Sequence, residues 1–63
     1  MDTITITRGP QSWLATFSGQ KGAELERHFG QATIPTPFRA TCPAETVLRE
    51  IGQRNPNSAV RLG

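Results

Sequence analysis

The sequence predicts a single small α+β domain. Three observations predict this class: a strict two-residue alternation near the start of the chain, two later segments with helical features, and a length that allows one hydrophobic core. A chain of 63 residues is too short to build a second core. We therefore expect one domain over residues 1–63, with the element order β-β-α-loop-α-β.

The first two elements are predicted to form a β-hairpin. Residues 3–7 alternate threonine with isoleucine, and β-branched residues at a period of two are typical of a strand. A glycine-proline pair favours a turn, after which residues 12–18 alternate again. Trp13 and Phe17 share one face of this second strand, so we expect Trp13 in the core. With the opposite parity, Leu14 would be buried and Trp13 would be a surface contact.

Two short helices are predicted further along the chain. Residues 23–29 place Leu25 and Phe29 four positions apart, and we expect these side chains to hold the helix against the sheet. Gly30 follows at the position where a C-terminal cap requires left-handed backbone, so we expect the helix to end there. The second helix is expected to begin after Cys42, which would occupy the capping position before a proline. It ends at the Asn-Pro pair of residues 55–56.

The remaining segments complete a predicted three-stranded antiparallel sheet. Residues 31–41 contain Pro35 and Pro37, which exclude a helix and favour an extended connection. Residues 59–62 alternate again as a short strand, with Leu62 facing inward. The simplest arrangement places the first strand in the middle, antiparallel to both others, with both helices on one face. The second strand then lies at an edge of the sheet.

The composition argues against several kinds of site. One cysteine and one histidine cannot form an internal disulfide or a four-ligand zinc site, and no phosphate-binding glycine motif is present. We therefore expect no metal and no cofactor. The sequence shows no signal peptide and no apolar run long enough to cross a bilayer, so we expect a soluble protein of a bacterial-type cytoplasm.

Cys42 is the one candidate nucleophile. A thiol at a helix N-terminus gains stability as a thiolate from the free amides there. A nucleophile also needs a base and an orienting group, and nothing in the sequence brings His28 to Cys42. A small residue at a capping position explains the same pattern. We expect no enzymatic activity, and a reactive thiol is kept as a third alternative.

The leading functional expectation is a protein-interaction module, acting as a homodimer or as a small accessory or regulatory subunit. The core is thin for independent stability, and the predicted sheet has exposed edges. The second strand carries no charge, lysine or proline to protect its edge. The candidate interface residues on this strand are Trp13, Leu14, Thr16 and Ser18.

The alternative expectation is a nucleic-acid-binding module. The chain has a formal net charge of +2, and the predicted sheet presents a threonine-rich face. Arg8, Arg39 and Arg61 would contact phosphates beside this face. This function requires the three arginines to gather on one surface.

Several short motifs are spread over nearly the whole chain. They are W-L-A at 13–15, F-G at 29–30, I-P-T-P-F at 34–38, P-A-E at 43–45, N-P at 55–56 and V-R-L at 60–62. In these motifs the chain resembles a group of short uncharacterised bacterial single-domain proteins of unknown function. The motifs mark turns and element ends, so the resemblance supports the fold and implies no activity.

Overall fold

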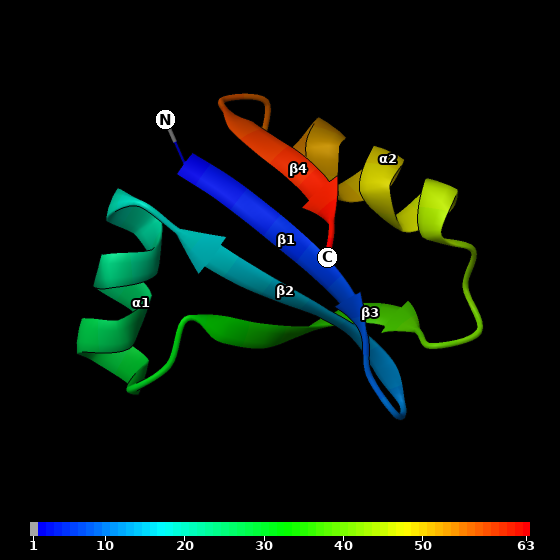
Figure 1. Cartoon of the computed structure of the whole chain (residues 1–63), viewed down its shortest axis with the longest axis horizontal. Helices are drawn as coiled ribbons and strands as arrows, with labels where there is room; N and C mark the ends of the chain where they lie inside the picture. Colours follow the sequence, from blue (N-terminus) through cyan, green and yellow to red (C-terminus); the bar gives the residue numbers. More distant parts are fainter. Residues whose placement is uncertain (1) are drawn as a thin grey trace.

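The computed structural model describes residues 2–63, which form a four-stranded sheet and two helices (Figure 1). The elements are β1 (Asp2–Arg8), β2 (Ser12–Ser18), α1 (Gln20–Phe29), β3 (Thr33–Arg39), α2 (Ala44–Arg54) and β4 (Ser58–Leu62). The α+β class is confirmed. The prediction of three antiparallel strands is wrong, because the sheet is mixed and has the order β3-β2-β1-β4.

The predicted hairpin is confirmed. β1 and β2 pair antiparallel, with Thr5 opposite Thr16. The amide of Gly9 donates to the carbonyl oxygen of Ser12 at 3.0 Å and closes a two-residue loop. This hydrogen bond also sets the pairing pattern, because backbone groups along an antiparallel strand alternate between its two neighbours. Ser12, Leu14 and Thr16 therefore direct their backbone groups to β1.

β3 occupies the segment that we expected to be an unpaired connection, and that expectation is wrong. It pairs antiparallel with β2, with Ile34 opposite Ala15. The amide of Phe17 donates to the carbonyl oxygen of Ala32 at 2.9 Å, so the backbone groups of Ala32 and Ile34 face β2. Pro35 consequently turns its nitrogen to the outer border, where the missing N–H removes no hydrogen bond of the sheet.

The pairing of β2 and β3 contains an irregularity held by one threonine. The register shifts between Ser12 and Leu14. At this point the hydroxyl group of Thr36 donates to the carbonyl oxygen of Trp13 at 2.8 Å and accepts from the amide of Phe38 at 3.3 Å. The side chain thus satisfies backbone groups that the regular ladder leaves unpaired at a bulge.

β4 runs parallel to β1, with Arg61 opposite Thr5, and the expected antiparallel pairing is wrong. The physical reason is the additional strand. β3 reverses the chain once more than predicted, and α2 then carries the chain back across the sheet. A strand that follows such a crossover keeps the direction of the strand before it, so β4 has the direction of β3 and β1.

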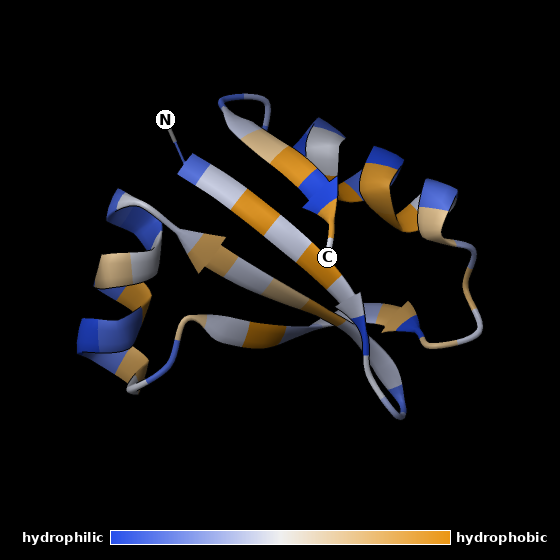
Figure 2. Cartoon of the chain, in the orientation of Figure 1, coloured by the Kyte–Doolittle hydropathy of each residue, from blue (hydrophilic) through white to orange (hydrophobic). Residues whose placement is uncertain are grey.

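The core lies between the sheet and α2, which covers one face (Figure 1). Trp13 is 2% exposed, so its predicted place in the core is confirmed. Figure 2 shows the corresponding alternation of hydrophobic and polar bands along β1. The buried hydrophobic side chains among the described residues are Ile4, Ile6, Trp13, Ala15, Val47 and Ile51. Leu62, which we expected to face inward, is 52% exposed.

α1 lies at the end of the sheet instead of covering its core face, which corrects the predicted arrangement (Figure 1). The helix begins at Gln20, and the carboxylate of Asp2 accepts a hydrogen bond from the Gln20 amide at 3.1 Å. No α1 side chain belongs to the described core cluster, and Phe29 is 71% exposed. The expected anchoring of the helix through Phe29 is therefore wrong.

Two glycines explain how α1 is placed. Gly22 is buried against β2, and a Cβ at this position would lie 2.3 Å from the carbonyl oxygen of Phe17. Only a residue without a side chain allows this approach. Gly30 ends the helix with φ 78° in the left-handed region, as the sequence predicts, and its amide donates to the backbone carbonyl oxygen of Glu26 at 2.8 Å.

Candidate functional site

The predicted interface on β2 does not lie at a sheet edge, because β3 pairs with its outer side. Trp13 is buried, and Leu14 and Thr16 lie on the sheet face opposite the core. Ser18 is the last residue of the strand, and its hydroxyl group donates to the carbonyl oxygen of Thr3 at 3.1 Å. The backbone of β2 is therefore occupied on both sides, and the prediction that it offers a free edge is wrong.

The β3 border is one of the two edges of the sheet, and two prolines protect it. Pro35 faces outward and carries no N–H, and Pro37 lies within the register shift and likewise has no N–H. An incoming strand would find no donor at either position. Proline is one of the devices that natural proteins use to prevent pairing at an exposed edge.

The β4 border has no such protection. The amide of Gly63 donates to the carbonyl oxygen of Ile6 at 2.9 Å, so the backbone groups of Arg61 and Gly63 face β1. The backbone groups of Val60 and Leu62 therefore face outward, and no hydrogen-bond partner for them occurs within residues 2–63. The strand contains neither proline nor lysine. We call Ser58–Leu62 with its outward backbone groups the open edge.

The side chain of Arg8 makes contacts within the domain. Its guanidinium group lies 4.4 Å from the centre of the Trp13 ring and donates a hydrogen bond to the carbonyl oxygen of Ala40. In this position the guanidinium group covers the aromatic ring, and the quadrupole of the ring attracts the positive charge. Arg54 similarly lies 5.7 Å from the centre of the Phe38 ring.

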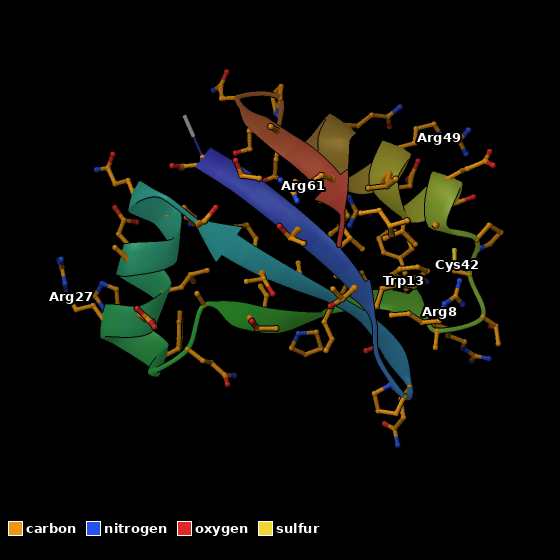
Figure 3. The ribbon with its side chains drawn as sticks, in the orientation of Figure 1. Arg8, Trp13, Arg27, Cys42, Arg49 and Arg61 are labelled. Atoms are coloured by element: carbon orange, nitrogen blue, oxygen red, sulfur yellow. The ribbon has the colours of Figure 1, made fainter. Side chains whose placement is uncertain are left out.

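The three arginines proposed for nucleic-acid binding do not share one surface. Arg61 lies opposite Thr5 on the sheet face away from the core, and Arg39 lies opposite Ser12 on that same face at the other border. Arg8 has the parity of the core face. Figure 3 shows Arg8 beside Trp13 and well apart from Arg61. The structure therefore places two of the three arginines on the threonine-rich face, on opposite border strands.

The threonine-rich face is uncovered by either helix (Figure 1). The only acidic residue within the four strands is Asp2, whose carboxylate accepts the hydrogen bond from Gln20. The hydroxyl groups on the threonine-rich face come from three strands. Those of Thr16 and Thr33 lie 2.9 Å apart, within hydrogen-bond distance. The threonines on this face are Thr3, Thr5, Thr7, Thr16 and Thr33.

Cys42 lies in the loop before α2, where it is partly buried and packs against the core. The helix begins at Ala44 with Pro43 as its N-cap, so the predicted capping role of Cys42 is wrong. The carbonyl oxygen of Cys42 instead accepts a hydrogen bond from the Trp13 indole nitrogen at 2.9 Å. His28 belongs to α1, at the opposite end of the molecule (Figure 1), so the fold does not bring His28 to the thiol.

Comparisons with family models, curated proteins and solved structures found no match for the chain. No group of three potential metal-ligating side chains and no pocket is found in the part of the chain that the structure describes. Neither described helix has the length and apolar character needed to span a membrane. The resemblance to short bacterial proteins stays a prediction, and the surfaces of the fold provide the functional argument.

Proposed function

We propose that this chain is a small non-enzymatic protein-interaction module that binds a protein strand along the open edge. The difference between the two borders of the sheet carries this proposal. Two prolines remove donors from the β3 border, whereas β4 presents the outward backbone groups of Val60 and Leu62. A sheet protected on one border and left open on the other is arranged for pairing on that open border.

Strand addition at the open edge would satisfy both the backbone and the side chains there. Each amide and carbonyl that now faces solvent would gain a partner, and a typical hydrogen bond contributes about 1 kcal/mol net. Leu62 is 52% exposed, so half of its side chain is available for burial against a bound strand. The small core supports the same conclusion, because domains of this size commonly gain stability from a partner.

Site-specific photo-cross-linking in host cells tests this function. A photoreactive residue at Leu62 lies on the open edge, and the same residue at the exposed Arg39 lies on the protected border as a control that keeps both prolines. We expect protein adducts at position 62 and few at position 39. Equal yields at the two positions, or no adducts at position 62, would contradict the proposal.

A second candidate function is binding of a nucleic-acid backbone to the threonine-rich face. It is favoured by the placement of Arg39 and Arg61 on a face whose strands contribute no acidic side chain to it. Titration with single-stranded and duplex oligonucleotides at two salt concentrations tests this function. Arg61→Ala should weaken binding and Arg27→Ala, on α1, should not. Absence of binding at low salt would reject this function.

A further inference from the structure

We infer that the strand bound by the open edge is β4 of a second copy of this chain, running antiparallel. This inference rests on the proposed function and names its partner. The first argument is the number of available borders. The two prolines disfavour pairing along the β3 border, so each copy offers one unprotected edge. Pairing of two identical edges about a twofold axis consumes both and closes the assembly as a dimer.

The second argument is the register that β4 allows. An antiparallel pair forms hydrogen bonds only where residues with outward backbone groups lie opposite each other. In β4 these positions are centred on Val60, so Val60 would face Val60 of the second copy and Ser58 would face Leu62 of the second copy. The Ser58 amide already donates to the carbonyl oxygen of Asn55 at 3.1 Å, so at this position only the Ser58 carbonyl oxygen would accept a hydrogen bond, from the Leu62 amide of the second copy. This register uses the whole strand of five residues.

The third argument is the placement of charge. In the register centred on Val60, Ala59 lies opposite Arg61 of the second copy, so neither arginine faces a like charge. Shifting the register by one allowed step toward the C-terminus would bring the two Arg61 side chains directly opposite each other. Like charges at directly opposite positions destabilise an antiparallel pair. The charge pattern of β4 therefore disfavours this shift, whereas the opposite shift, which places Ala59 opposite Ala59, is disfavoured because it shortens the overlap of the two strands.

The fourth argument concerns Leu62, one of two large hydrophobic side chains that the described chain leaves exposed. Its side chain has the parity of Ile6 and lies on the core side of the sheet. In the inferred dimer it would lie opposite Ser58 and diagonally adjacent to Val60 of the second copy. Diagonal cross-strand neighbours are within reach of long side chains, so the dimer would cover this apolar surface.

Sedimentation equilibrium of variants at Ala59, from micromolar to millimolar protein, tests the register directly. Ala59 is exposed on β4, so substitution there leaves the core intact. Ala59→Glu places a carboxylate opposite Arg61 of the second copy at two symmetric positions. We expect the dimer dissociation constant to decrease by about 2- to 30-fold, the range for two opposite-charge cross-strand pairs. Ala59→Arg should increase it by a similar factor.

Two further variants separate this effect from a change of net charge. Gln31→Arg adds the same charge in a loop away from β4 and should leave the dissociation constant unchanged. The double variant Ala59→Arg/Arg61→Glu places an arginine at position 59 opposite a glutamate at position 61 of the second copy. This pair of opposite charges should restore dimerisation. Equal effects of Ala59→Glu and Ala59→Arg, or a wild-type chain that stays monomeric at millimolar concentration, would overturn the inference. Cross-linking at position 62 to a different protein would then retain the proposed function while rejecting the second copy.

Discussion

Replacing Gly22 with alanine perturbs the contact that places α1 against the sheet. A Cβ at this position would lie 2.3 Å from the carbonyl oxygen of Phe17 and 2.9 Å from its carbonyl carbon. Close carbon–oxygen contacts settle at about 3.3 Å, so the helix would have to move by about 1 Å. Both facing atoms belong to the backbone of a paired interior strand, which cannot yield as a flexible side chain can.

The free-energy change has two opposing parts. Overpacking of this kind costs about 1 to 3 kcal/mol, whereas alanine gains about 1 kcal/mol over glycine in helix propensity. We therefore expect Gly22→Ala to lower the free energy of unfolding by up to about 2 kcal/mol. Gly52→Ala is the matched control within α2, because a Cβ there meets no atom within 4 Å. It should raise the free energy of unfolding by about 0.5 to 1 kcal/mol.

Urea denaturation followed by the fluorescence of the buried Trp13 measures both variants. The two substitutions are chemically identical and lie in helices, so they differ mainly in what the new methyl group contacts. In thermal denaturation, the melting temperatures of the two variants should differ by about 10 °C for a domain of this size. Equal shifts of the same sign for Gly22→Ala and Gly52→Ala would refute the close packing of α1 on β2.

The remaining predictions concern three further contacts. Asp2→Ala removes the acceptor for the Gln20 amide and should lower the free energy of unfolding by about 0.5 to 2 kcal/mol; an unchanged urea midpoint would contradict this capping role. Arg8→Ala uncovers Trp13, so we expect a red shift of its fluorescence and a loss of about 0.5 to 1 kcal/mol, and an unchanged spectrum would reject the stacking. Thr36→Val leaves the Trp13 carbonyl without its hydroxyl donor and should cost about 1 to 3 kcal/mol by thermal denaturation, whereas wild-type stability would show that the bulge does not need this side chain.

The sequence predicted the elements whose pattern is local. The alternation of residues 3–7 and 12–18 predicted the hairpin, and the parity of Trp13 predicted its burial. Gly30 predicted the end of α1 because its left-handed conformation is a local requirement. The start of α1 was missed, because its capping carboxylate comes from Asp2, far away in the sequence.

The arrangement of the sheet depended on a strand that local rules argue against. Pro35 and Pro37 predict a connection in isolation, but a proline whose nitrogen faces the outer border removes no hydrogen bond of the sheet. Omitting β3 reversed the predicted direction of β4 and exposed β2 as an edge. The free edge was consequently predicted on β2, which is an interior strand. The sequence feature that distinguishes the two borders of the sheet is proline: Thr33–Arg39 contains two, and Ser58–Leu62 contains none.

Amide hydrogen exchange of Val60 and Leu62, measured by NMR across a range of protein concentrations, tests the open edge most directly. Both amides lack a partner within the described chain, so they should exchange rapidly in dilute protein. As the dimer forms, protection should rise at these two amides while that of Thr33, on the protected border, stays constant. Rapid exchange at Val60 and Leu62 at every concentration, under conditions where sedimentation shows a dimer, would contradict pairing through β4.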